Sequence, residues 1–126
     1  MPAKNRPRAR NTGPTPAVRQ AVYARDLTRC VRCGSATTLT VQHRVNRAMG
    51  GSSDPAINSP ANLLTACQAC NMAFEARPAE AYRFGWKVRR PTDPATVPVW
   101  TTLGGWMLMS DDGTATKIQA PEGFRR

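Results

Sequence analysis

Four cysteines in two CxxC pairs are the residues of this chain whose spacing most clearly indicates chemistry. The pairs are Cys30 with Cys33 and Cys67 with Cys70, and they use every cysteine of the 126 residues. Two such pairs are a common donor set for tetrahedral zinc, because four thiolates at this spacing can surround one cation. The sequence therefore predicts one structural Zn²⁺ held by all four cysteines.

The interval between the two pairs carries the only histidine of the chain, His43. It is also longer than the roughly 15 to 20 residues that separate the pairs of a simple zinc ribbon. An imidazole with an ordinary pKa near ~6.5 is mostly neutral at physiological pH and can take a proton from water. His43 is therefore a candidate general base, with a structural histidine or a further zinc ligand as the alternatives.

Amides and glycines follow His43 at spacings that form a pattern with the cysteines. In chain order, the members are the first CxxC pair, Gln42-His43, Gly50-Gly51, Asn62, the second CxxC pair and Asn71. This order resembles the zinc-containing branch of the HNH endonucleases over residues 19 to 76. The resemblance implies a ββα-metal fold and the hydrolysis of DNA phosphodiester bonds with a divalent cation.

The resemblance also implies a role for each position that matches. His43 matches the general base, Asn62 matches the asparagine that bridges the loop of the ββα unit, and Asn71 matches a ligand of the catalytic cation. The alternative for Asn71 is a residue at a helix start that satisfies a backbone amide. The implied cation is Mg²⁺ or Mn²⁺, which prefer oxygen ligands and keep several waters.

Gln42 departs from the family pattern, in which the residue before the catalytic histidine is usually an acidic or histidine metal ligand. Amide oxygens from Gln42 and Asn71 alone would bind a hard cation weakly. Glu75 lies four residues after Asn71 and so on the same face of the expected helix, where its carboxylate can supply the missing charge. Asp54 is a weaker candidate. The neutral Gln42 leaves open an alternative function, a zinc-stapled DNA-binding protein that has lost cleavage.

Basic residues outnumber acidic residues by 18 to 8, and the formal net charge is +10. A charge of this size indicates a polyanionic partner, with nucleic acid the leading candidate, although the same charges can simply keep a small protein soluble. One basic cluster lies near the N-terminus, and another follows the second CxxC pair. The residues expected to contact DNA are Arg44, Arg83, Lys87, Arg89 and Arg90.

Local patterns predict the elements that would position these residues. Thr15 before Pro16 is typical of a helix start, β-branched residues before His43 indicate a strand, and glycine and aspartate turns separate short strands near the C-terminus. The predicted elements are a disordered basic arm over 1–14, a helix over 15–25, a strand over 37–41, helices over 69–76 and 79–84, and strands over 97–100, 106–109 and 115–118.

These elements predict an α+β fold, which the resemblance narrows to a small zinc-stapled ββα-metal (HNH) domain with an N-terminal helix and a C-terminal β-meander extension. The nuclease domain is expected over 15–90, and the extension over 91–126 is expected to pack on it. Because no run of ~18 apolar residues occurs, no membrane association is expected. A cytoplasmic location fits cysteines that bind zinc instead of forming disulfides. The resemblance adds a phage or mobile-element origin, with the host cytoplasm as location and phage packaging machinery as a further partner.

Overall fold

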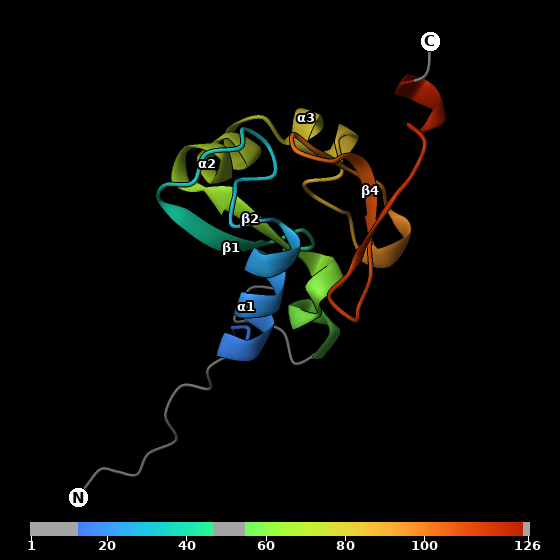
Figure 1. The fold of residues 1–126 in the computed structure, drawn as a ribbon. Coiled ribbons are helices and arrows are strands. Elements are labelled where there is room, and N and C mark those ends of the chain that lie inside the picture. Colours follow the sequence, from blue (N-terminus) through green and yellow to red (C-terminus); the bar gives the residue numbers. More distant parts are fainter. Residues whose placement is uncertain (1–12, 47–54, 125–126) are drawn as a thin grey trace, which may run out of the picture.

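A computed structural model of the chain describes residues 13–46 and 55–124. Most of the expected basic arm, the Gly50-Gly51 turn and Asp54 lie outside the described residues. Within them the fold is α+β, with three α-helices and two antiparallel sheets (Figure 1). The predicted α+β class is therefore confirmed. No helix of the described part of the chain has the length and apolar character needed to span a membrane.

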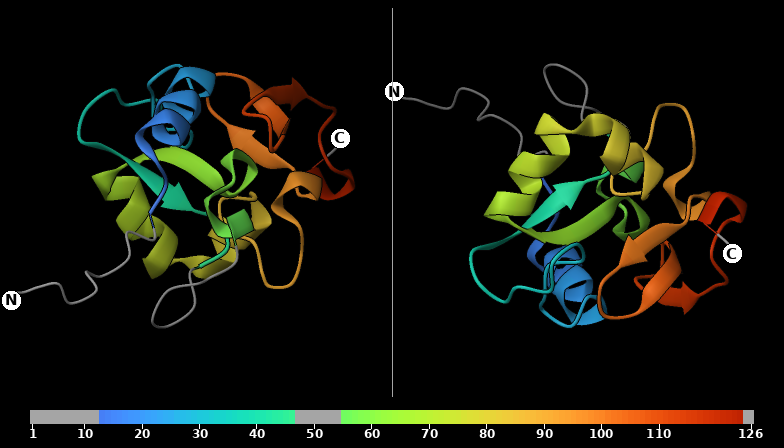
Figure 2. Two further views of the ribbon diagram at one scale, coloured as in Figure 1. Left: turned by 90° about the horizontal axis from the view of Figure 1, so that it is seen from below. Right: turned by 90° about the horizontal axis from the view of Figure 1, so that it is seen from above.

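A two-stranded antiparallel sheet lies in the middle of the molecule. β1 (Leu39–His43) pairs with β2 (Leu63–Cys67), and the register sets His43 opposite Leu63 at one end. The strand begins two residues after its predicted start, because Thr38 has a φ of +54° that no extended strand accommodates. Helices α1 and α2 cover opposite faces of this hairpin (Figure 2), and all five residues of β2 are buried.

The N-terminal helix α1 (Pro16–Arg25) confirms the predicted helix, and the Thr15 hydroxyl accepts from the Val18 amide at its start. At its end, Arg25 and Asp26 form a buried ion pair of 2.8 Å. Arg25 also donates to the Leu63 carbonyl, and Asp26 accepts from the Thr65 amide. Because both charged groups have further partners on β2, the pair fastens the helix end to the hairpin.

Two helices follow β2 and confirm the helices predicted there. α2 (Gln68–Ala76) starts directly after the strand, and α3 (Pro78–Arg83) follows one residue after α2 ends. Gly85 then turns the chain with a φ of +80°, and a Cβ at this position would lie 1.9 Å from the Pro98 carbonyl oxygen. Only glycine allows the two backbones to approach so closely. This approach brings the C-terminal region against α3.

The C-terminal region forms the predicted meander, a three-stranded antiparallel sheet in the order β3-β4-β5. Val99 and Met109 of this sheet lie in the same hydrophobic core as Leu64 of β2 and Phe74 of α2. The strands are β3 (Val99–Thr101), β4 (Gly105–Met109) and β5 (Ala115–Lys117). Short 3-10 helices complete the fold, namely η1 (Pro55–Asn58), η2 (Pro60–Asn62), η3 (Pro94–Thr96) and η4 (Glu122–Phe124).

Arg44, which follows β1, is completely buried, with 0% of its surface exposed. In this structure the side chain is therefore not accessible for the predicted contact with DNA. Burial lowers the pKa of its guanidinium to about 9, with the charge of Arg25 as a smaller cause, so the group is still charged at neutral pH. Its N–H groups join separate irregular segments by donating at 2.8–3.0 Å to the carbonyls of Ala61, Gly85, Pro94 and Val97.

We expect Arg44→Met to lower the free energy of unfolding by about 3 kcal/mol or more. Two buried and two partly buried carbonyls would lose their donor, and each unsatisfied buried polar group costs about 1–3 kcal/mol. Urea denaturation measures the change. Arg19→Met, at an exposed position of α1, is the matched control and should stay within about 0.5 kcal/mol of the wild type. Equal stabilities of the two variants would contradict the joining role of Arg44.

Candidate functional site

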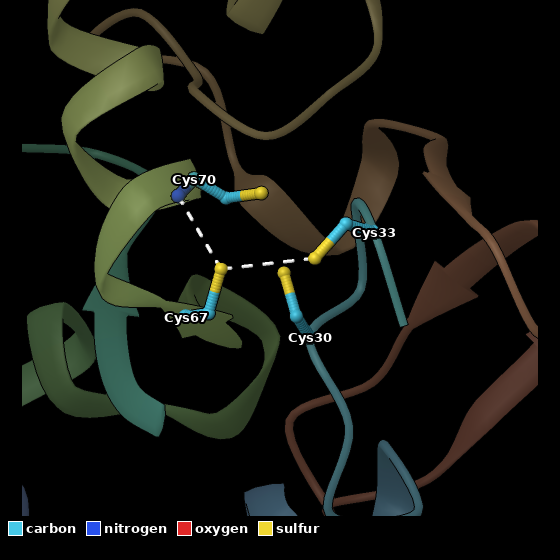
Figure 3. Close-up of side chains that lie close together, drawn as sticks. All are labelled: Cys30, Cys33, Cys67 and Cys70. Carbon is cyan, nitrogen blue, oxygen red and sulfur yellow. Dashed lines mark hydrogen bonds between the residues drawn. The ribbon is translucent and has the colours of Figure 1, made fainter. Parts of the chain in front are cut away.

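The four cysteines lie together between the turn after α1 and the first turn of α2 (Figure 3). Their Sγ atoms all lie within 4.8 Å of one another, and those of Cys33 and Cys67 are 3.7 Å apart. Zinc bonded to four sulfurs at about 2.3 Å separates them by about 3.8 Å. A disulfide would need about 2.05 Å, and all four thiols are free. The predicted clustering is confirmed, and the cluster is compatible with a bound zinc ion.

Local backbone geometry forms this cluster. Gly34 adopts a φ of +81°, and its amide donates to the Cys30 carbonyl, which closes the turn that carries the first pair. Cys67 is the N-cap of α2, where its sulfur accepts from the Cys70 amide at 3.4 Å. A helix N-terminus favours negative charge, so this position suits a thiolate.

Arg32 supplies a positive charge beside the cluster. Its Nη1 lies 3.4 Å from the Cys70 sulfur, and its Nη2 lies 3.3 Å from Glu80. Burial raises the pKa of the Cys70 thiol to about 12, while the Arg32 hydrogen bond acts in the opposite direction. Arg32 therefore offsets part of the negative charge that four thiolates would carry. Its place between the two cysteines of the first CxxC pair is the one signal in the sequence that could have indicated this role.

His43 is the last residue of β1, and its ring contacts a second side chain. Its Nε2 lies 2.7 Å from Oδ1 of Asn58, the last residue of η1. Asn58 is not among the site residues predicted from the sequence, and this contact was missed. The two residues are 15 positions apart, and only the path of the chain between β1 and β2 brings them together. Nothing in the local sequence of Asn58 distinguishes it from other turn residues.

Asn62 is buried at the end of η2 and holds the two sides of the β1–β2 connection together. Its Oδ1 accepts from the Val45 amide at 2.8 Å, and its Nδ2 donates to the Ile57 carbonyl at 2.9 Å. The two contacts bridge the connection between the strands. Asn62 therefore stabilises the backbone around His43, and its side chain bonds main-chain atoms of Val45 and Ile57.

The three predicted ligands of a catalytic cation have different surroundings. Gln42 is buried within β1, where the alternation of a strand directs it to the face opposite that of His43. Asn71 lies in the first turn of α2 and is partly exposed. Glu75 lies one turn later, and its Oε2 is 2.9 Å from the Lys87 ammonium. A divalent cation at Glu75 would have to compete with this ammonium group.

A second metal centre is not apparent in residues 13–46 and 55–124. Among these described residues, one group of three or more His, Cys, Asp or Glu side chains lies close enough together to hold an ion. It consists of the four cysteines. The residues predicted to bind Mg²⁺ or Mn²⁺ supply two neutral amides and one carboxylate already paired with lysine. They do not form a ready site for a hard cation, which prefers charged oxygen ligands.

Lys87 is another basic residue that the structure places inside the protein. Only 4% of its surface is exposed, and its Nζ contacts Glu75 and the Asn46 side chain. In this structure its ammonium group is therefore not accessible for the predicted contact with DNA. The backbone explains the position, because the Lys87 amide donates to the Ala81 carbonyl and draws the chain back along α3.

Arg83, Arg89 and Arg90 are exposed at and after the end of α3. The Arg89 guanidinium lies 3.8 Å from the centre of the Tyr82 ring, and that of Arg83 lies 4.6 Å from the centre of the Phe124 ring. A ring under the guanidinium plane restricts its motion and leaves the N–H edge facing outward. Arg83 and Arg89 are thus exposed charges that lie over aromatic rings.

The structure thus brings the four cysteines together and sets His43 beside Asn58 and the Asn62 bridge. It separates Arg44 and Lys87 from the solvent and pairs Glu75 with lysine. Comparisons of this chain with models of protein families, with curated proteins and with solved structures find no match.

Proposed function

We propose that this protein is an HNH-type endonuclease that hydrolyses DNA phosphodiester bonds, with His43 as the general base. The observation that supports this most is the position of His43 at the end of β1, in a hairpin whose connection is bridged by Asn62. The second strand of the hairpin leads directly into α2 at the cysteine cluster. Strand, bridged connection, strand and helix occur in the order of the ββα-metal pattern that the sequence resembles.

The chemistry of His43 suits this role. Hydrolysis of a phosphodiester needs a base that removes a proton from water, and a histidine with an ordinary pKa is suited to this near neutral pH. The ring is partly exposed and is held at the strand end by its contact with Asn58. A positioned base contributes typically 10²- to 10⁴-fold to a reaction rate.

The proposed dependence on Mg²⁺ or Mn²⁺ has weaker support than the proposed base. Asn71 and Glu75 share one face of α2, but the carboxylate is paired with Lys87. The DNA phosphates would therefore have to provide most of the charged oxygen ligands, as they do for many weakly held magnesium ions. When bound, such a cation would polarise the phosphate group.

The same observation favours a second candidate function, a DNA-binding protein without cleavage. Gln42 is neutral and buried, and the Glu75 carboxylate is already paired with an ammonium group. Neither position therefore offers an unpaired negative charge to a catalytic cation. In this alternative the cysteine cluster and the arginines Arg83, Arg89 and Arg90 keep their roles. The two candidates differ only in the chemical step.

The four cysteines are proposed to hold one structural Zn²⁺. We expect the purified protein to contain about one zinc ion per chain and to lose its core structure on chelation, because metal binding is part of the folding free energy. Zinc affinity should fall as the pH falls, since protons compete with the metal for the thiolates. Elemental analysis and circular dichroism measure both effects. A reduced, zinc-free protein that stays folded would contradict this assignment.

His43→Ala is expected to lower the rate of plasmid nicking in Mg²⁺ or Mn²⁺ by about 10²- to 10⁴-fold, because the base acts in the chemical step. DNA affinity and zinc content should stay nearly unchanged, since affinity comes mainly from phosphate contacts. A variant that nicks at the wild-type rate would refute His43 as the base. A wild-type protein that binds DNA but cleaves with neither cation would favour the binding-only function.

The exposed arginines after α3 give a separate prediction. Arg89→Gln combined with Arg90→Gln should weaken DNA binding and reduce the slope of log K against log salt by about 1.8, because each lost phosphate contact accounts for about 0.9. Fluorescence anisotropy at several salt concentrations measures both quantities. Arg19→Gln with Arg29→Gln removes the same charge from exposed positions elsewhere and is the matched control. Equal effects of the two pairs would argue against DNA contacts at Arg89 and Arg90.

A further inference from the structure

The hydrogen bond between His43 and Asn58 constrains the histidine ring. Its Nε2 lies 2.7 Å from the amide oxygen Oδ1. An amide oxygen can only accept, so Nε2 must carry the proton in this contact. A neutral imidazole has one protonated and one basic nitrogen, and the contact therefore makes Nδ1 the basic atom of the ring.

The backbone that carries Asn58 is itself fixed by contacts other than the one with the ring. It ends η1, and the preceding carbonyl, that of Ile57, accepts from Asn62 Nδ2 at 2.9 Å. The Ile57 side chain is buried in a small hydrophobic cluster with Val45 and Val88. One polar contact and one apolar cluster thus fix the backbone from which the Asn58 amide extends.

The same Asn62 side chain also holds the strand end that carries His43. Its Oδ1 accepts from the amide of Val45, two residues after the histidine. The Arg44 amide, between them, donates to the Asn62 carbonyl at 2.7 Å. A single residue therefore ties the strand end to η1, and the distance between the ring and Asn58 is set on both sides.

We propose that Asn58 is the positioning residue of His43. Its amide oxygen fixes the ring orientation and keeps the proton on Nε2, so that Nδ1 is the atom that removes a proton from water. The catalytic meaning of this orientation rests on the proposed nuclease function. The orientation and the site of protonation can be measured in the absence of DNA.

Because the chain has one histidine, nuclear magnetic resonance of protein labelled with ¹⁵N-histidine reports this ring alone. The spectra are recorded at about pH 9, where a model histidine with a pKa of ~6.5 is neutral. We expect the wild type to carry its proton on Nε2 and to exchange it slowly with water. Asn58→Asp keeps an acceptor at the same place and should preserve this signal. Asn58→Leu has a similar shape without an acceptor and should lose the slow exchange.

Two results of this measurement would overturn the proposal. One is a wild-type ring protonated on Nδ1, and the other is an Asn58→Leu protein whose ring signals match the wild type. Zinc content and thermal unfolding check that each variant is folded, and Asn58→Ala replaces the leucine variant if that protein is unstable. Asn62→Ala is a useful contrast, because it should lower stability as well as release the ring.

Cleavage assays then separate this proposal from the proposed function. In an active wild type, Asn58→Leu should lower kcat about 10- to 100-fold with KM nearly unchanged, and Asn58→Asp should recover most of the loss. Unchanged kcat in the leucine variant would overturn the positioning role. An inactive wild type with the expected ring signals would reject the nuclease function and leave the contact between Asn58 and His43 established.

Discussion

Four sulfur atoms within 4.8 Å of one another join two parts of the chain that are 34 residues apart, the turn after α1 and the start of α2. This approach also determines where the hairpin begins. Leu39 lies opposite Cys67, so the register of β1 and β2 is counted from the cysteine cluster. Four residues further along β1, the register places His43 opposite Leu63, at the end of the sheet where η1 and η2 lie. The position of the histidine thus depends on sulfurs at the other end of the hairpin.

Irregular backbone makes up a large part of this small protein, and buried polar side chains satisfy it. Every buried carbonyl or amide needs a partner, and in the segments without sheet or helix side chains supply part of these partners beside other backbone groups. Arg44 donates to four carbonyls, Asn62 bonds both sides of one connection, and Asp26 accepts from a β2 amide. Buried polar side chains therefore pair backbone groups that lie outside the helices and strands, as well as one amide of β2.

Local signals in the sequence were sufficient for the elements. Thr15 with Pro16 predicted the start of α1, and the spacing of the cysteines predicted their cluster. The start of β1 was placed too early, because the left-handed backbone of Thr38 has no signature in a run of β-branched residues. Except for the cysteine cluster, which joins two pairs 34 residues apart, those predictions depended on residues within a few positions of one another, where propensity and spacing act directly.

Contacts between distant residues could not be predicted in this way. Arg44 donates to a carbonyl 53 positions away in the sequence. Lys87, which follows α3, contacts Glu75 of the preceding helix α2. In the sequence, Arg44 and Lys87 have the character of surface charges. They differ from the exposed Arg89 only in the residues that the fold packs around them. Asn58 is the same case for an amide, since its partner His43 comes near only when the connection between the strands closes.

A row of stacked aromatic rings crosses the boundary between the hairpin region and the C-terminal sheet. Phe74 stacks on Trp86, Trp86 on Phe84, and Phe84 on Trp106, with ring centres 5.1–6.1 Å apart. Because each ring covers the next, neither part can be removed without exposing a large apolar face of the other. The C-terminal sheet is thus no interchangeable module appended to an independent core. Gene rearrangements that separated the two would have to replace the rings on both sides of the break at once.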